Sequence, residues 1–150
     1  MTVFVDSSAL VKLYVAEGHH ASVRRISDPM VVSALARVEV PAALWRKYRT
    51  GDIAAADAAV LSAEFASDLV GDGLPAPRFA IVSVTDEVLT EAVEAVARHS
   101  LRAYDSVQLG SALVVRRALG ALDGFVAFDI ALRAAASAEG LRPIPRDLHL

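Results

Sequence analysis

The stretch that decides the fold is Thr2-Val3-Phe4-Val5-Asp6-Ser7-Ser8-Ala9-Leu10-Val11-Lys12-Leu13-Tyr14. Its first four residues form a short apolar run, which is typical of a buried strand, and the run stops at an aspartate. Either of the two serines that follow is suited to cap a helix, and an apolar-rich segment then continues to Tyr14. A strand, a polar turn and a helix start together open an α/β unit.

Strands and helices are expected to alternate along the rest of the chain. Apolar runs predict strands at residues 30–33, 79–84 and 124–128, and a short edge strand at 142–144. Helices are expected at 19–27, 34–50, 53–70, 86–99, 105–119 and 130–139. The strands are apolar throughout rather than alternating in polarity, which indicates parallel strands covered by helices on both faces. We therefore predict an α/β protein with one domain over residues 1–150.

Composition excludes several classes of protein. Of the 150 residues, 55% are hydrophobic, which excludes a disordered chain, and the lack of cysteine excludes a disulfide scaffold or a thiolate metal site. No apolar stretch approaches the roughly 20 residues that span a bilayer, and no secretory signal opens the sequence. We expect a cytoplasmic protein with no membrane partner. The net charge of −3 argues mildly against a nucleic-acid ligand.

Four acidic residues stand where an α/β sheet places its ligands. Asp6 and Asp129 directly follow predicted strands, Glu39 lies between two valines early in a helix, and Asp105 opens another helix. The carboxyl ends of parallel strands meet at one edge, so these carboxylates are expected to converge there. Grouped carboxylates repel one another unless a cation lies among them. Mg²⁺ and Mn²⁺ prefer oxygen ligands and serve phosphodiester cleavage, which makes them the expected cations.

A simpler interpretation of the same acids stays open at this point. Aspartates at strand ends and helix starts are common as caps, and Asp105 and Asp129 both fit that role. Glu39 is harder to explain in this way, because glutamate is rarely buried among valines without a partner.

Four segments that span nearly the whole chain carry a resemblance to a known family. They are residues 5–14, 36–40, 101–109, and 128–129 with the downstream Leu132, Gly140 and Leu141. In order and spacing they resemble PIN-domain ribonucleases, specifically the VapC-like toxins of bacterial toxin–antitoxin pairs. The resemblance implies a three-layer α/β/α sandwich around a short, mostly parallel sheet. It also implies an endoribonuclease that depends on Mg²⁺ or Mn²⁺ and inhibits translation or growth.

The resemblance also implies roles for particular residues. Asp6, Glu39, Asp105 and Asp129 match the family's acidic quartet as catalytic residues and metal ligands, and Ser8 matches a supporting hydroxyl. Two residues before the last acid, where the family often carries serine or threonine, this chain has Ala127. The implied partners are an RNA substrate, a cognate antitoxin protein and a second copy of the chain in a homodimer. Lys12 and Arg102 are candidates for binding RNA phosphate, with ordinary surface charge as the alternative.

Other functions remain as alternatives. Receiver and haloacid-dehalogenase-like folds also place an aspartate after the first strand, but the latter need a second aspartate where this chain has Ser8. A housekeeping PIN-domain nuclease of RNA processing and a non-catalytic PIN-like binding module are closer alternatives. With four of the 18 acidic residues assigned to a metal site, the remaining 14 nearly balance the 15 Lys and Arg. The charge then permits an RNA partner.

Overall fold

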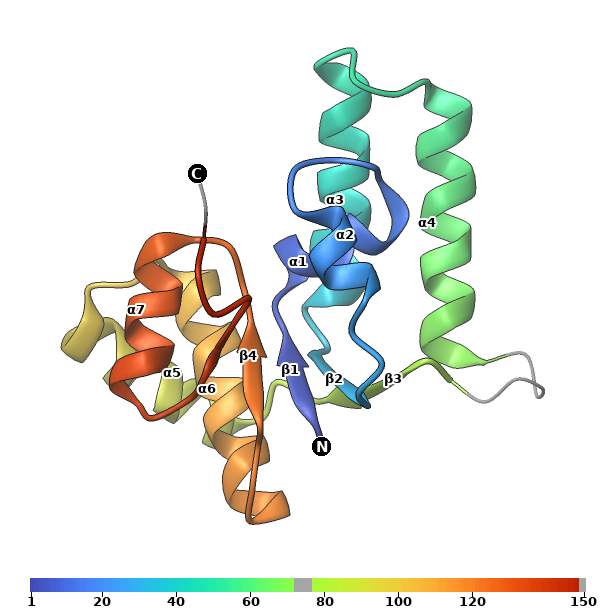
Figure 1. Ribbon diagram of the computed structural model, residues 1–150. Helices are drawn as coiled ribbons and strands as arrows, with labels where there is room; N and C mark the ends of the chain where they lie inside the picture. The colour runs from blue at the N-terminus through green and yellow to red at the C-terminus, as the bar shows by residue number, and fades with distance from the viewer. Residues whose placement is uncertain (72–76, 149–150) are drawn as a thin grey trace.

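A five-stranded sheet runs through the middle of the molecule, and all of its paired strands are parallel (Figure 1). The computed structural model describes residues 1–71 and 77–148. The strands are β1 (Val3–Val5), β2 (Met30–Ser33), β3 (Phe79–Val82), β4 (Gly124–Val126) and β5 (Pro143–Ile144). The helices are α1 (Ser7–Tyr14), α2 (His20–Arg24), α3 (Ala36–Arg49), α4 (Ala55–Val70), α5 (Asp86–His99), α6 (Ala103–Leu119) and α7 (Ile130–Ala138).

The strand order reverses at the centre of the sheet. The order is β3-β2-β1-β4-β5, so the chain builds outward from β1 on one side and then returns to add β4 and β5 on the other. Ligand sites of open parallel sheets lie at the carboxyl ends of the strands where the order reverses. Here that point lies between β1 and β4. Asp6 directly follows β1, and Asp129 comes three residues after the end of β4.

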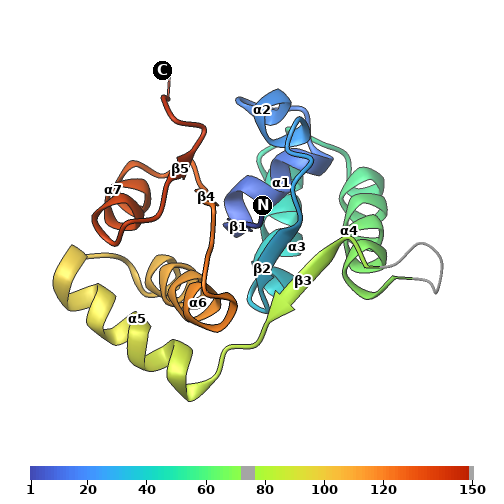
Figure 2. The same cartoon turned by 60° about the horizontal axis from the view of Figure 1, so that its bottom comes forward.

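Helices cover the sheet on both faces, in agreement with the predicted three-layer α/β/α sandwich. α1 to α4 lie on one face and α5 to α7 on the other (Figure 2). The β1 residues alternate between two buried clusters, because Val3 and Val5 pack with the first helix layer and Phe4 packs with the second. Phe4 stacks on Phe125 of β4 with ring centroids 5.5 Å apart, which ties the two central strands together.

Some expected core positions are exposed instead. The strands were predicted to be covered by helices on both faces. In the edge strand β3 this prediction is wrong, because Ala80 and Ile81 are exposed. On α3, apolar residues lie on more than one side: Val38 and Trp45 are at the surface, while Ala36, Val40 and Leu44 are buried. These sets differ in helical phase, and apolar composition alone does not decide between them when a helix has apolar residues on several sides.

The helix starts also differ from prediction in ways that affect the site. Asp6, rather than either serine, caps α1. α6 begins at Ala103, so Tyr104 and Asp105 lie in its first turn and Asp105 is not its cap. Asp129 caps α7 by accepting from the Leu132 amide at 2.9 Å, as the simpler interpretation of that residue predicted. The candidate acids are thus held by regular elements rather than by loops.

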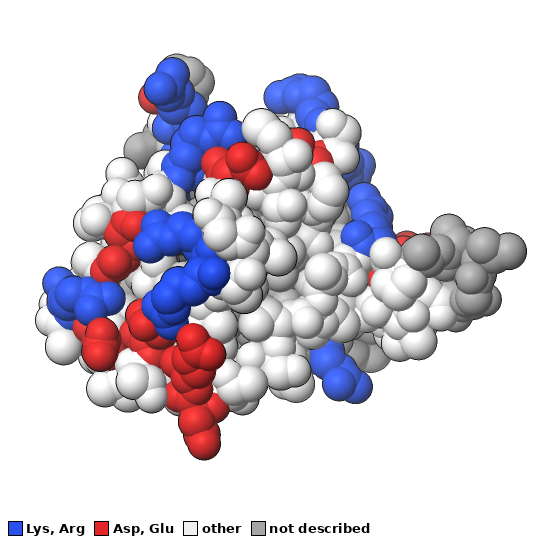
Figure 3. Space-filling model, turned by 90° about the horizontal axis from the view of Figure 1, so that it is seen from below, with Lys and Arg blue, Asp and Glu red and all other residues white. Residues whose placement is uncertain are grey.

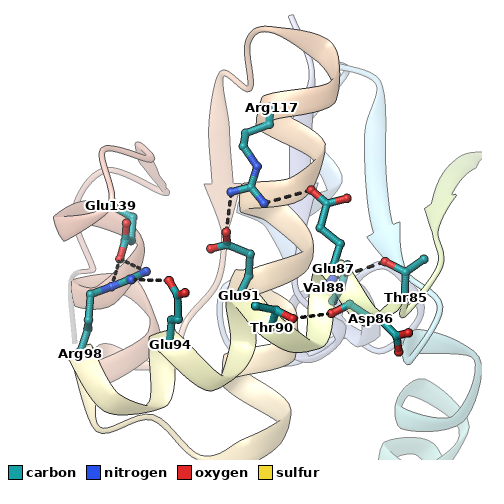
Figure 4. Close-up of polar contacts among 10 residues, drawn as sticks. All are labelled: Thr85, Asp86, Glu87, Val88, Thr90, Glu91, Glu94, Arg98, Arg117 and Glu139. Carbon is teal, nitrogen blue, oxygen red and sulfur yellow. Dashed lines mark hydrogen bonds and ion pairs between the residues drawn. The ribbon is translucent and has the colours of Figure 1, made fainter.

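Ion pairs tie the second helix layer together, as Figure 4 shows. Arg117 of α6 contacts Glu87 and Glu91 of α5 at 3.2 and 2.7 Å. Arg98 of α5 contacts Glu94 at 3.1 Å and Glu139, just after α7, at 2.9 Å. Each pair is individually weak at an exposed surface, but together they link three helices.

The face opposite the candidate site carries mixed charges and a wide uncharged area. Seen from below, basic and acidic side chains gather side by side over one part of this face, and the middle is uncharged (Figure 3). This face therefore presents no extended basic patch of the kind that binds nucleic acid without sequence preference. Within the residues that the structure describes, no helix has the length and apolar character needed to cross a membrane.

Candidate active site

Asp6 is a buried carboxylate at the carboxyl end of β1. Only 5% of the residue is exposed, and Oδ2 accepts hydrogen bonds from the Ser8 hydroxyl and from the Ser8 amide at 3.2 Å. Burial raises the pKa of Asp6 to about 6, and the charges of Glu39 and Asp105 add to the increase, while the Ser8 hydrogen bonds oppose it. Ser8 thus contacts the acid that it was predicted to support.

Glu39 lies in the first turn of α3 and is held by uncharged partners. Its Oε1 accepts hydrogen bonds from the Ser7 hydroxyl at 3.1 Å and from Gln108 Nε2 at 2.8 Å. Gln108 Nε2 also donates to Ser7 Oγ at 2.8 Å, which closes a triangle between α1, α3 and α6. The sequence analysis missed Ser7 and Gln108 as site residues. The available signal was a glutamine one turn after Asp105, between Val107 and Leu109.

Asp105 and Asp129 share a single arginine. Arg102 Nε donates to Asp105 Oδ2 at 2.8 Å, and its guanidinium lies 3.6 Å from Asp129 Oδ2. The pKa of Arg102 is raised, first by the hydrogen bond to Asp105 and then by the charges of Asp105, Asp129 and Asp6. The guanidinium therefore provides positive charge to three of the four predicted acids. In the structure Arg102 is thus paired with two site acids, and its contact with RNA phosphate stays a prediction.

Lys12 points to a different set of groups. Its ammonium donates to Glu17 Oε1 at 2.9 Å and to the Gly18 carbonyl at 2.8 Å, and it lies 4.9 Å from the centroid of the Phe128 ring. Glu17 also receives a hydrogen bond from Lys47. Burial disfavours ionisation of Glu17, but the hydrogen bonds from the two lysines outweigh burial and lower its pKa. In the structure Lys12 is therefore engaged by neighbouring protein groups. Its contact with RNA stays a prediction.

The four acids lie near one another, but their side chains are not arranged as a set of metal ligands. Within residues 1–71 and 77–148, no group of three or more His, Cys, Asp or Glu side chains is arranged to hold a metal ion. The donor set nevertheless fits a hard divalent cation, because it consists of carboxylate and hydroxyl oxygens. Within the described part of the chain, Asp6 makes no direct ion pair, and burial raises its pKa. The guanidinium of Arg102 contacts Asp105 and Asp129 instead. Ser8 contacts Asp6, Ser7 and Gln108 contact Glu39, and Arg102 contacts both Asp105 and Asp129.

Comparisons with known proteins agree with this architecture. The profile of the PIN domain matches residues 3–138. A chain from a toxin–antitoxin complex of Klebsiella pneumoniae superimposes with a TM-score of 0.60 at 13% identity, covering 98% of this chain and 96% of that one. The sarcin–ricin loop cleaving toxin VapC20 of Mycobacterium tuberculosis gives a TM-score of 0.59 at 21% identity, covering 89% and 94% respectively. No match was found among curated proteins.

Proposed function

This chain belongs to the PIN domain family, and on that premise we propose that it is an Mg²⁺- or Mn²⁺-dependent endoribonuclease that acts as the toxin of a toxin–antitoxin pair. The observation that carries the proposal is the grouping of Asp6, Glu39 and Asp105 around the strand-order reversal, where the latter two charges raise the pKa of the first. Structural likeness to VapC20 and to a toxin–antitoxin complex supports the choice of toxin over other PIN-domain functions.

The catalytic roles follow from where each carboxylate lies. In our proposal Asp6 and Asp105 are the main metal ligands, while Glu39 and Asp129 bind or orient water or a second ion. A divalent ion bound there supplies Lewis-acid activation of water and neutralises charge on the phosphate. Water attacks phosphorus in line, the bond to the 3′ oxygen breaks and that oxygen takes a proton, which yields a 5′-phosphate and a 3′-hydroxyl. The 2′-hydroxyl takes no part in this reaction.

The proposed partners follow from the same function. An RNA is the substrate, an antitoxin protein is the inhibitor, and two copies of the chain form a homodimer in the cytoplasm. Exposed apolar side chains on the neighbouring helices α3 and α4, such as Val38 and Val60, support a protein-binding surface there.

Substituting Asp6→Asn is the direct test of the activity. Asparagine keeps the size and the capping oxygen of Asp6 but removes its charge, so we expect the fold to persist and cleavage to be lost. Cleavage of RNA would be followed on denaturing gels with Mn²⁺ or Mg²⁺, and with EDTA as the metal-free control. Full activity of Asp6→Asn would overturn the assignment of the site.

Induced expression in a bacterium tests the toxin role. Growth arrest by the wild type but not by Asp6→Asn is the result expected for a toxin nuclease. Arrest by both proteins would instead indicate inhibition through binding. A wild type that cleaves RNA in vitro but leaves growth unaffected would favour a housekeeping nuclease.

A further inference from the structure

Two adjoining hollows open beside the carboxylates, between α3 and α6. One has a volume of about 310 Å³ and is lined by Glu39, Arg46, Arg102, Ala103, Tyr104 and Asp105. The other, of about 290 Å³, shares Glu39, Arg46 and Tyr104 and extends to Ser7, Ser8, Ala42 and Ala43. Each hollow is at the lower end of the volumes typical of small-molecule sites. The shared residues place an arginine and a tyrosine next to the acid that α3 provides.

Arg46 contributes a cation that its protein neighbours do not neutralise. It lies two helical turns after Glu39, so both residues lie on the same side of α3. Within the described part of the chain, its guanidinium makes neither an ion pair nor a hydrogen bond, whereas Arg102 is engaged by Asp105 and Asp129. A guanidinium is suited to bind phosphate through two parallel hydrogen bonds.

Tyr104 contributes an exposed aromatic ring. It directly precedes Asp105 in the first turn of α6, and 66% of the residue is exposed. Across the described residues, the ring neither stacks on another ring nor donates a hydrogen bond. Aromatic side chains in this situation are the usual platform for unpaired bases, since every base has a face on which to stack.

Small residues keep the space between these two side chains open. Ala42 and Ala43 lie on α3 between Glu39 and Arg46 and line the second hollow. Larger side chains at those positions would fill the hollow next to the carboxylates. The arrangement thus combines a phosphate-binding cation, a stacking ring and free volume within reach of the acids.

On the basis of the proposed function, we propose that these hollows bind one unpaired nucleotide next to the cleaved phosphodiester. Arg46 binds a backbone phosphate and Tyr104 stacks on the base. Bases inside a duplex are already stacked and are not accessible to the ring, so the substrate is single-stranded at this position. Arg46 and Tyr104 therefore determine substrate choice while the carboxylates perform the chemistry.

The first experiment measures RNA binding without cleavage. In the Asp6→Asn background, the protein is titrated into a fluorescein-labelled single-stranded oligoribonucleotide of one defined sequence that does not pair with itself, and the anisotropy is recorded. Tyr104→Ala is expected to weaken binding about tenfold, within the range known for the loss of one stacked base. Arg46→Ala is expected to weaken it about as much, through the loss of charge-assisted hydrogen bonds to phosphate. Tyr104→Phe keeps the ring and should retain binding. The same strands annealed into duplex should bind about tenfold more weakly than the single strands.

Matched controls come from the same helix as Arg46. Arg49 and Tyr48 are exposed on α3 but line neither hollow, so Arg49→Ala and Tyr48→Ala should leave binding unchanged. Ala42→Leu is expected to weaken binding by filling the hollow, whereas Ala66→Leu, at an exposed position of α4, should not. Equal losses in the test and control variants would show a general charge or stability effect and would overturn the proposal.

The second experiment separates substrate binding from chemistry. In the cleaving protein, Arg46→Ala and Tyr104→Ala should raise KM about tenfold and change kcat less than about twofold. A loss confined to kcat would overturn the proposal. Unchanged RNA binding in both variants would also overturn it, and this is the result expected if the hollows bind a protein segment instead of RNA. Failure of the nuclease function would be seen separately, as a wild type that cleaves no RNA although its RNA binding depends on Arg46 and Tyr104.

Discussion

At the scale of single residues, Glu39 depends on uncharged side chains for its position. The carboxylate can only accept hydrogen bonds, so Gln108 must turn its amide nitrogen toward Glu39 and Ser7. This orientation leaves Gln108 Oε1 buried without a partner among the described residues. An unpartnered buried acceptor costs about 1–3 kcal/mol of stability. The arrangement thus favours the position of Glu39 over full hydrogen bonding of Gln108.

Replacing Gln108 should weaken the metal site more than the fold. Gln108→Leu removes both hydrogen bonds that the amide donates but keeps an apolar side chain of similar size. We expect the affinity for Mn²⁺ to fall about tenfold, as happens when residues that hold metal ligands are removed. Isothermal calorimetry with Mn²⁺ measures this affinity. Ser111→Ala is the control, because among the described residues this buried serine donates its hydrogen bond within its own helix, to the Val107 carbonyl. Equal affinities in all three proteins would contradict the role of Gln108.

Removing Arg102 should have the opposite effect on metal binding. The guanidinium neutralises Asp105 and Asp129, so a metal ion has to compete with it for these carboxylates. We expect Arg102→Ala to bind Mn²⁺ about two- to fivefold more tightly, since exposed ion pairs are weak. Arg98→Ala, which breaks comparable pairs with Glu94 and Glu139 outside the candidate site, is the control. Weaker Mn²⁺ binding in Arg102→Ala alone would show that the arginine helps to build the site.

The sequence gives a local signal for the four candidate acids but not for their neighbours. Asp6 and Asp129 directly follow runs that the sequence predicts as strands, and that pattern alone suggests the carboxyl edge of the sheet for both. Ser7 and Gln108 are 101 positions apart in the sequence, and they meet only because α1 and α6 pack around the same strand end. The contact between Arg102 and Asp129 similarly needs the full topology.

At the scale of elements, α6 places the site relative to α5. It carries Asp105 and Gln108. Gly110, two residues after Gln108, faces α5 at close range. A Cβ added at Gly110 would lie 2.9 Å from the Val88 carbonyl oxygen and 3.0 Å from the Ala92 amide nitrogen. These are backbone atoms, so the two helices would have to move apart to admit a methyl group.

Gly110→Ala should therefore destabilise the protein although alanine favours helices. The gain in helix propensity is about 1 kcal/mol, and overpacking against a backbone typically costs about 1–3 kcal/mol. We expect a net loss of about 1 kcal/mol in the free energy of unfolding, measured by urea denaturation. Gly18→Ala is the control, because a Cβ there meets no atom within 4 Å. A stabilised Gly110→Ala variant would show that the helices separate without cost.

Element types were predicted more accurately than element faces and starts. β2 was predicted with its observed bounds, because Pro29 precedes a short apolar run. All four residues of the strand are buried. The start of α6 was set two residues late, since neither Ala103 nor Tyr104 signals a helix start. Hydrophobicity alone would also place the wrong side of α5 in the core, because Leu89, Val93 and Val96 are exposed while Ala92 and Ala95 are buried. Tight packing against α6 selects these small residues, which hydrophobicity alone does not reveal.

At the scale of the whole molecule, the fold keeps a carboxylate in a place that disfavours its charge. Asp6 is enclosed by the sheet and by both helix layers, and burial is the main cause of its raised pKa. Ionised Asp6 therefore reduces the stability of the metal-free protein. Such a cost is common where a site must hold a charge ready for a ligand.

Replacing Asp6 by an uncharged side chain should accordingly stabilise the metal-free protein. This gain is expected at neutral pH, where Asp6 is ionised, and not at acidic pH. The pKa of Asp6 is about 6 in the folded state against 3.8 in the unfolded state, so the folded protein binds more protons between these values. Stability from this group is greatest below pH 3.8 and falls by up to about 3 kcal/mol as the pH rises past 6. Asp6→Asn does not ionise, so its advantage over the wild type in urea denaturation with EDTA should be near zero at pH 4 and largest at pH 8. Adding Mn²⁺ at pH 8 should reduce the difference in unfolding free energy between the two proteins by stabilising the wild-type carboxylate. If Asp6→Asn were more stable than the wild type by the same amount at every pH, burial of charge would not be the cause.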